Sequence, residues 1–336
     1  MSHDMIAERI HIAGQQNHDG LFPVAYQPSH GTVSLEQTQQ WIEDQSSKLI
    51  AEASRHGAVL LRGFAVRSAE DFDAVISAFG LDSFTYEESL SNAVRVNLTP
   101  RVFTANEAPP DVSIFLHHEM AQTPLFPSRL FFCCETAPSS GGETPLCRSD
   151  ILLERLQEAR PEFVEQCERL GVRYVNVMPP HDDAASGQGR SWRSTLNAAD
   201  QAAAERRLHQ LGYDAQWIDD GSLRATTPVL PAVRSLVDGR RVFFNQLIAA
   251  FRGWKDARND PQKSICFGDG SVIGTQDMDT AIRLADELSF DLAWQAGDVA
   301  LIDNFLVMHG RRPFQGKRRV FASLVADDGE RLAKAS

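Results

Sequence analysis

The segment Leu116 to Met120 reads Leu-His-His-Glu-Met and contains the side chains with the clearest potential for metal chemistry. Taken as His118-Glu119, it opens like the HExxH helix of zinc peptidases, which needs a second histidine three residues after the glutamate. That position is Gln122, and Pro124 follows closely, so a long helix is not expected here. We therefore reject a zinc-peptidase site.

The same segment has a second interpretation, in which His117 and Glu119 lie two positions apart on a β-strand. Side chains at this spacing point the same way, so the imidazole and the carboxylate would converge on one metal ion. His118 would then point away and serve a structural or supporting role. Because such a triplet is a weak signal by itself, a third ligand must come from elsewhere.

His309 is the histidine best placed to supply that third ligand. It follows the apolar run from Phe305 to Met308, whereas most of the 10 histidines lie in polar or terminal stretches: His3, His11, His18, His30, His181 and His209. His117, Glu119 and His309 would form a facial triad of two histidines and one carboxylate, which leaves three coordination positions open on Fe(II). A 2-oxo acid would chelate through two of these positions, and dioxygen would take the third.

A 2-oxo diacid also needs its far carboxylate held, and the planar fork of an arginine suits this task. Arg319 lies ten residues after His309, at the start of a strand-like run, so a turn and a return strand would bring it back beside the iron. Arg318 would alternate to the other face of the strand and is expected in solvent. Alternatively, both arginines have no role in binding and are simply exposed charged residues at the start of a strand.

Hydrophobic periodicity and turn residues predict the elements that position these groups. Helices are expected over 35–56, 69–79, 150–167 and 200–211, and strands over 58–61, 130–134, 242–244, 299–302 and 319–324. Helices are thus concentrated in the first two-thirds of the chain, among short strands. This pattern favours an α+β protein with a β-sheet core and flanking helices over a regular alternating α/β fold.

Length and composition indicate a globular protein. The chain has 336 residues, of which 43% are hydrophobic, enough to bury a core. We expect residues 1–336 to form a single domain, with 1–30 peripheral. The segment 178–191 is rich in Pro, Asp, Gly and Ser, and is expected to be either an active-site lid or a passive surface excursion.

Charge and cysteine usage exclude several classes. The net charge of -12 argues against a nucleic-acid partner, since phosphate binding needs a basic surface. The first 14 residues carry no secretory signal, and no apolar stretch is long enough to span a bilayer. Five cysteines without a framework spacing fit a reducing compartment, so a cytoplasmic protein is expected. The adjacent Cys133 and Cys134 are expected to face opposite sides of a strand as small buried residues.

The motifs together resemble the superfamily of taurine dioxygenase and clavaminate synthase, which are Fe(II)- and 2-oxoglutarate-dependent oxygenases. The resemblance is closest to its branch of syringomycin-type, antibiotic-cluster amino-acid hydroxylases and covers the chain from Gly57 to the end. Its most specific blocks, in order, are 117–120, 130–133, 141–145, 244–246, 267–271, 297–298, 309–311 and 318–319.

The resemblance implies a double-stranded β-helix, or jelly roll, with the metal at one mouth. It assigns the iron ligands to His117, Glu119 and His309, and the 2-oxoglutarate carboxylate contacts to Arg319 and the hydroxyl of Thr144. The glutamate argues against the related halogenases, which replace that ligand with a small residue so that chloride can bind.

One departure from the family bears on the substrate. Taurine dioxygenase has a second arginine four residues after its co-substrate arginine, where it grips the sulfonate, and this chain has Ser323 there. A sulfonate substrate is therefore not expected, and an amino acid or a small amino-acid-derived metabolite of specialised metabolism, such as antibiotic biosynthesis, is favoured. Candidate substrate contacts are Arg95, Asn106 and Arg193, each of which has a structural or exposed role as its alternative.

Several functional alternatives stay open on sequence alone. The substrate is expected either free or tethered to a carrier protein, and like charge mildly disfavours an acidic carrier. Hydroxylation competes with desaturation, cyclisation or epoxidation on the same scaffold. A zinc-binding jelly-roll protein without oxygenase activity would not need Arg319 or Thr144. The oligomeric state is not encoded in any pattern that we recognise.

Overall fold

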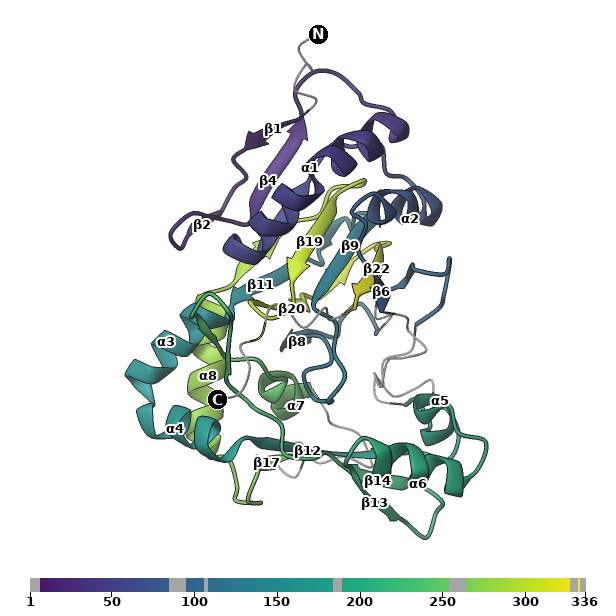
Figure 1. Cartoon of the computed structure of the whole chain (residues 1–336), viewed down its shortest axis with the longest axis vertical. Helices are drawn as coiled ribbons and strands as arrows, with labels where there is room; N and C mark the ends of the chain where they lie inside the picture. Colours follow the sequence, from purple (N-terminus) through teal and green to yellow (C-terminus); the bar gives the residue numbers. More distant parts are fainter. Residues whose placement is uncertain are drawn as a thin grey trace.

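Two facing β-sheets form the core of the computed structural model (Figure 1), which describes residues 7–84, 95–105, 108–183, 189–253, 264–326 and 332. The candidate Asn106 and the middle of the predicted loop 178–191 lie outside these residues. Both sheets are antiparallel, apart from one parallel pair between β4 and β5 in the larger sheet. This is the predicted α+β arrangement, with a jelly-roll core and flanking helices.

The larger sheet brings together strands from the whole length of the chain. Its order is β1 (Ala7–Ile10), β4 (Val24–Pro28), β5 (Ala58–Leu61), β19 (Val299–Asp303), β9 (Arg129–Thr136), β22 (Arg319–Val325) and β6 (Ser83–Phe84), with β7 (Phe103–Thr104) also paired to β22. The central strands are buried, which explains why 58–61, 130–134, 299–302 and 319–324 are recognisable in sequence as apolar runs.

The smaller sheet carries the candidate ligands. Its order is β18 (Phe290–Leu292), β11 (Thr144–Arg148), β20 (Val307–Arg311) and β8 (Ile114–His117). One hydrophobic cluster fills the space between the two sheets, and it includes Cys134 from β9, Leu146 from β11 and Ala322 from β22. Cys133, in contrast, packs in the cluster on the outer face of the larger sheet. The prediction that the two cysteines face opposite sides is confirmed.

Helices α1 (Leu35–His56) and α2 (Ala69–Ser77) cover that outer face (Figure 1). A capping box between Ser34 and Gln37 starts α1, and Gly57 ends it with φ 103°. A β-carbon at Gly57 would lie 2.6 Å from Cγ2 of Val307, so packing as well as backbone conformation requires glycine there.

A four-stranded sheet lies below the core in Figure 1. Its order is β13 (Asp214–Trp217), β14 (Leu223–Thr226), β12 (Val172–Met178) and β17 (Ile265–Phe267), and the short helices α5 (Trp192–Leu196) and α6 (Gln201–Gln210) pack beside β13 and β14. Three two-stranded ribbons complete the strands: β2 (Gln16–Asn17) with β3 (Leu21–Phe22), β10 (Ser140–Gly141) with β21 (Phe314–Gln315), and β15 (Arg234–Ser235) with β16 (Arg241–Val242).

The predicted helix 150–167 is wrong in one respect, because the structure has two helices there. They are α3 (Ser149–Ala159) and α4 (Pro161–Leu170). Pro161 begins the second helix because proline lacks the N–H that a continuing helix would need, and it disfavours helical geometry at the preceding Arg160.

Six of the eight helices in the described residues lie in the first two-thirds of the chain, as predicted, but two helices of the last third were missed. Helix α8 (Thr275–Glu287) lies in the last third and packs against α3, and α7 (Leu247–Gly253) packs beside β8. Likewise, the predicted strand 242–244 is only the two-residue β16. The remaining two positions, Phe243 and Phe244, are buried hydrophobic residues outside any strand, so their apolar character reflects burial alone.

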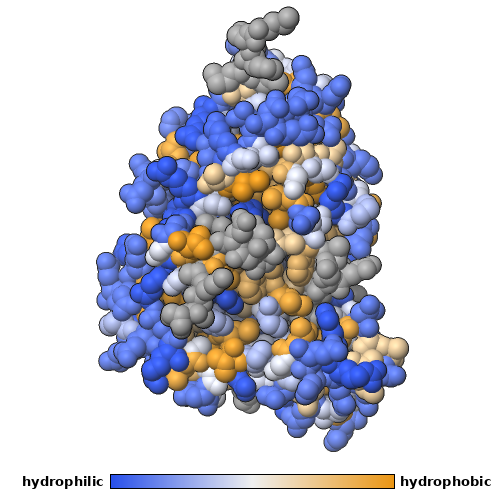
Figure 2. Space-filling view, viewed as in Figure 1, coloured by the Kyte–Doolittle hydropathy of each residue, from blue (hydrophilic) through white to orange (hydrophobic). Residues whose placement is uncertain are grey.

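Polar and charged residues cover most of the face shown in Figure 2, and hydrophobic residues gather toward its middle. Within the described ranges, no helix combines the length and the apolar character that crossing a membrane requires.

Candidate metal centre and co-substrate site

Three side chains from β8, the turn after it and β20 converge on one point. His117 ends β8 and pairs across the strands with His309 of β20, and Glu119 follows two residues later. Their ligand atoms all lie within 4.8 Å of one another, with Nε2 of His309 3.6 Å from Oε2 of Glu119. In the part of the chain that the structure describes, this is the one group of three or more such side chains that could hold a metal ion.

The protonation states suit metal binding. The Nδ1 of His117 lies 2.7 Å from the carbonyl oxygen of Phe115, so Nδ1–H donates there and the Nε2 lone pair is available. Burial, aided by the nearby His309, lowers the pKa of His117 to about 4, so the ring is neutral at pH 7. Burial alone would raise the pKa of Glu119, but Arg95 and the two histidines outweigh it and hold that pKa well below its usual range. A neutral imidazole and an ionised carboxylate are the forms that bind a divalent cation.

The turn that carries Glu119 is held by Asn304, a fully buried residue just after β19. The Oδ1 of Asn304 accepts from the Glu119 N–H at 2.8 Å, and its Nδ2 donates to the carbonyl oxygens of Glu119 and Pro127 at 3.0 and 2.7 Å. Met120, the next residue, has a left-handed φ of 58°. Glu119 therefore lies beyond the end of β8, and its position depends on the hydrogen bonds from Asn304 as well as on the geometry of the strand.

His118 does not join the triad. Its side chain is buried, Nδ1–H donates to the carbonyl oxygen of Asn304, and the ring packs 4.8 Å from that of Phe244. Burial lowers the pKa of His118 to about 3, so this ring is also neutral. His118 thus belongs to the same hydrogen-bond network around Asn304 that holds the Glu119 backbone.

We expect Asn304→Ala to lower the free energy of unfolding by about 2–4 kcal/mol, because it leaves buried backbone groups without partners. The looser turn should also reduce Fe(II) occupancy. Urea denaturation and iron stoichiometry measure the two effects. Gln40→Ala, at an exposed residue of α1 whose side chain bonds the nearby Asp44, is the control and should change neither. Full stability and full iron occupancy in Asn304→Ala would show that the hydrogen bonds of Asn304 are dispensable.

Arg318 and Arg319, at the start of β22, are oriented opposite to the prediction, which placed Arg319 beside the metal and Arg318 in solvent. Nη1 of Arg319 forms an ion pair with Glu135 at 2.9 Å, its guanidinium lies over the ring of Phe321, and its side chain is 44% exposed. Phe321 belongs to the cluster on the outer face, whereas Val320 belongs to the inner one. The placement of Arg319 beside the metal is therefore wrong: its pairing with Glu135 and its contact with Phe321 hold it away, and a register shift between Arg319 and Val320 interrupts the strand alternation on which the prediction relied.

Arg318 instead lies against the loop that leads to Thr144. Its Nε donates to the carbonyl oxygen of Gly142 at 3.0 Å, and the side chain is half-buried. Burial and the nearby Arg311 lower the pKa of Arg318 to about 10, so it remains a cation at neutral pH. A β-carbon at Gly142 would lie 3.0 Å from Cδ of Arg318, so glycine permits this close approach.

Thr144 is buried on β11, two residues from Leu146, which pairs with His309 on β20. Side chains two apart share a face, so Thr144 faces the space between the sheets, as Leu146 does. Its Oγ1 accepts a hydrogen bond of 2.9 Å from Nε1 of Trp294.

The predicted substrate contacts have different outcomes. The side chain of Arg95 reaches Glu119 and is buried with it. Arg193 is exposed on α5, stacks over Trp192 at 4.2 Å and donates to the carbonyl oxygen of Ala199. Its assignment as a substrate contact is therefore not supported, because these contacts hold it on the surface of the α5–α6 region.

Two residues of the site were missed from the sequence. Asn304 is a polar residue directly after an apolar strand, which signals a buried hydrogen-bonding role. Arg318 precedes β22, and the register shift between Arg319 and Val320 that decides its orientation has no local signal in the sequence.

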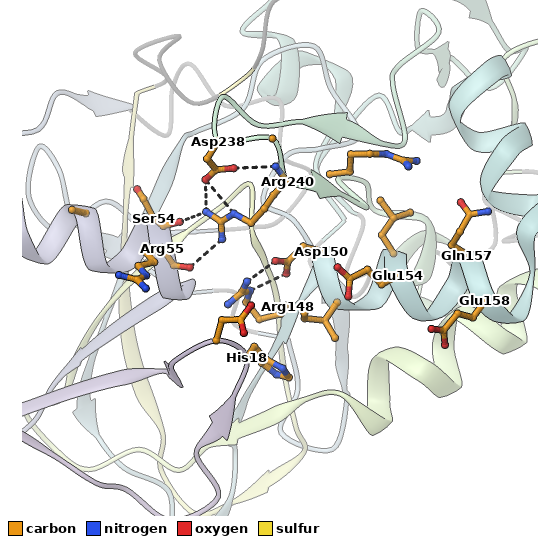
Figure 3. A pocket seen from close by; sticks show the side chains of 16 residues that line it. His18, Ser54, Arg55, Arg148, Asp150, Glu154, Gln157, Glu158, Asp238 and Arg240 are labelled. Carbon is orange, nitrogen blue, oxygen red and sulfur yellow. Dashed lines mark hydrogen bonds and ion pairs between the residues drawn. The ribbon is translucent and has the colours of Figure 1, made fainter.

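A separate cleft of about 1200 Å³ lies at the other end of β11 (Figure 3), and none of the triad residues lines it. Arg148 in its wall pairs with Asp150, and Arg240 pairs with Asp238 and with the carbonyl oxygens of Ser54 and Arg55. Arg148 and Arg240 are therefore engaged within the protein.

The sequence profile described as "Taurine catabolism dioxygenase TauD, TfdA family" matches residues 21–324. A clavaminate synthase-like protein of Arabidopsis thaliana is 43% identical over 309 residues, which is 90% of this chain and 93% of that protein. The dapdiamide synthesis protein DdaC of Enterobacter agglomerans is 27% identical over 289 residues, which is 81% of this chain and 83% of DdaC.

Among solved structures, the PvcB protein from Pseudomonas aeruginosa superposes with a TM-score of 0.53 at 15% identity, covering 93% of this chain and 90% of PvcB. A second PvcB structure is described as an Fe, alpha-ketoglutarate dependent oxygenase from an isonitrile synthetic pathway. At this level of identity the likeness shows the fold.

Proposed function

The chain belongs to the taurine catabolism dioxygenase TauD, TfdA family and is an Fe(II)- and 2-oxoglutarate-dependent dioxygenase, and on this premise we propose that it hydroxylates an amino acid or a small amino-acid-derived metabolite. We further propose that residues 1–336 act as one catalytic domain. The observation that carries the proposal is the convergence of the partly buried His117 with the buried Glu119 and His309 on one point. The relative DdaC, named for dapdiamide synthesis, supports a role in the biosynthesis of a small metabolite.

His117, Glu119 and His309 would hold the iron through two imidazole nitrogens and one carboxylate oxygen. Iron bound in this way supplies dioxygen activation coupled to loss of CO2 from 2-oxoglutarate, with one oxygen atom entering succinate and the other the substrate C–H bond. The protein would orient both substrates around the metal, and three protein ligands would leave room in its coordination sphere for 2-oxoglutarate and dioxygen. The buried positions of Glu119 and His309 and the partly buried position of His117 fit this role.

We assign the far carboxylate of 2-oxoglutarate to Arg318 and Thr144, in place of Arg319 and Thr144. Arg318 has further N–H donors beyond the one that Gly142 accepts. The indole N–H of Trp294 can only donate, so the hydroxyl hydrogen of Thr144 remains available for a carboxylate oxygen. Arg318, which contacts the loop before β11, and Thr144 on β11 would thus present a cation and a hydroxyl to one anion.

Anaerobic titration of the Fe(II)-loaded protein with 2-oxoglutarate tests the reaction class. Chelation should produce a weak charge-transfer band near roughly 500 nm, as an open facial triad allows. Succinate release with a panel of amino acids then identifies substrates. A product heavier by one oxygen indicates hydroxylation, and one lighter by two hydrogens indicates desaturation. Absence of the band in protein that demonstrably holds iron would refute the co-substrate site.

Thr144→Val should raise the KM for 2-oxoglutarate by about tenfold or more, since a hydrogen bond to a charged group contributes about 1.5–3 kcal/mol. Valine keeps the shape of the side chain and removes only the hydroxyl. Steady-state kinetics of succinate formation measure the change. Thr136→Val, at a half-buried residue of β9, is the matched control. Equal KM values for the two variants would remove Thr144 from the co-substrate site.

A further inference from the structure

Arg95 reaches the candidate metal centre from the segment before β7, outside the two strands, β8 and β20, that carry the histidines of the triad. Its backbone segment is tied to β7 by hydrogen bonds between Val96 and Thr104, and β7 in turn pairs with β22. The guanidinium lies 5.1 Å from the ring centre of Phe103. Arg95 is therefore attached to the larger sheet, while the three candidate ligands belong to the smaller sheet and its adjoining turn.

The contact with Glu119 is close and buried. Nη2 of Arg95 lies 3.1 Å from Oε1 and 3.2 Å from Oε2 of Glu119, and the two side chains are 8% and 6% exposed. Withdrawing both charges from water is costly, so the pair needs good geometry to persist. An arginine with no role in the site would more commonly keep its charged end in solvent.

The carboxylate of Glu119 needs such a partner. Asn304 holds only the backbone of Glu119, and several rotatable bonds separate that backbone from the carboxylate. A carboxylate can also bind a metal through one or both oxygens. If both oxygens bound, one of the three open positions would be lost and the co-substrate and dioxygen could not both be accommodated.

We propose that Arg95 is a positioning residue of the metal centre: its guanidinium, which contacts both oxygens of Glu119, orients the carboxylate and opposes its binding the metal through both oxygens at once. The proposal rests on the triad of the proposed function. Two effects of Arg95 on metal affinity oppose each other: its charge repels a divalent cation, and its hydrogen bonds pre-orient the ligand. Supporting residues of this kind typically contribute 10- to 100-fold to metal affinity or activity, so the orienting effect is expected to dominate.

Titration of the metal-free, full-length protein with Mn(II), followed by electron paramagnetic resonance, measures this effect without turnover. Arg95→Met keeps the length of the side chain but removes its donors, and we expect it to bind Mn(II) about 10- to 100-fold more weakly. Arg95→Lys keeps the charge and should be intermediate. Arg101→Met is the matched control, because Arg101 lies on the same segment but pairs with Asp73 away from the triad. It should bind Mn(II) like the wild type.

The affinity for 2-oxoglutarate provides a second readout, because it depends on how many coordination positions Glu119 occupies. At saturating Fe(II) without oxygen, Arg95→Met should bind 2-oxoglutarate about tenfold more weakly if Glu119 then occupies a second position. Arg101→Met should again match the wild type.

Unchanged Mn(II) affinity in folded Arg95→Met would overturn the proposal, and tighter binding would show that the guanidinium competes with the metal. Circular dichroism and thermal melting of the metal-free variants establish folding. If Arg95→Met does not fold, Arg95→Lys decides by the same criterion, with weaker Mn(II) binding expected. Failure of the proposed function itself looks different, because the wild type would then bind Mn(II) no better than His309→Ala.

Discussion

His309→Ala is expected to abolish stoichiometric Fe(II) binding and reduce 2-oxoglutarate turnover to background. The imidazole is one of three ligands whose atoms lie within 4.8 Å, and its side chain is 6% exposed, so water is poorly placed to replace it. Loss of a direct ligand should exceed the roughly 10- to 100-fold that loss of a supporting residue costs. Metal analysis after anaerobic loading and an assay of succinate formation measure the two effects.

The control is His209→Ala, at an exposed histidine on α6. This variant should bind one iron per chain and keep its turnover. If His309→Ala retained iron and activity at the level of His209→Ala, the triad would be wrong and another ligand set would have to be sought.

Arg318→Ala and Arg319→Ala should differ sharply in their use of 2-oxoglutarate. We expect Arg318→Ala to raise the KM for 2-oxoglutarate about 30- to 150-fold, because charge-assisted hydrogen bonds to a carboxylate contribute about 2–3 kcal/mol. Arg319 pairs with Glu135 on the outer face, and exposed ion pairs contribute about 0–1 kcal/mol, so Arg319→Ala should stay within about threefold of the wild type.

The charge-transfer band at moderate 2-oxoglutarate concentration provides the same comparison without turnover. Arg318→Ala should lose the band, and Arg319→Ala should keep it. The reverse pattern would restore the assignment made from sequence and would require the side chain of Arg319 to face the site.

The candidate metal ligands could be proposed from local sequence. The spacing of His117 and Glu119 and the apolar run before His309 singled them out, although Glu119 lies in the turn after β8 rather than on the strand itself. Helix α1 is equally local, because Ser34 caps its start and Gly57 ends it. The break at Pro161 was local too, and the prediction overlooked it.

The contacts that shape the site depend on tertiary structure. Asn304 bonds Glu119 across 185 positions of the chain, and Arg95 reaches the same residue from another sheet. The face on which Arg318 lies is set by how β22 registers with β9 and by which cluster covers each side. Sequence determined which side chains can hold a metal, since that is a property of residue type and spacing. Only the folded sheets decided which arginines and amides support them, because pairing register and packing bring together residues that no local pattern connects.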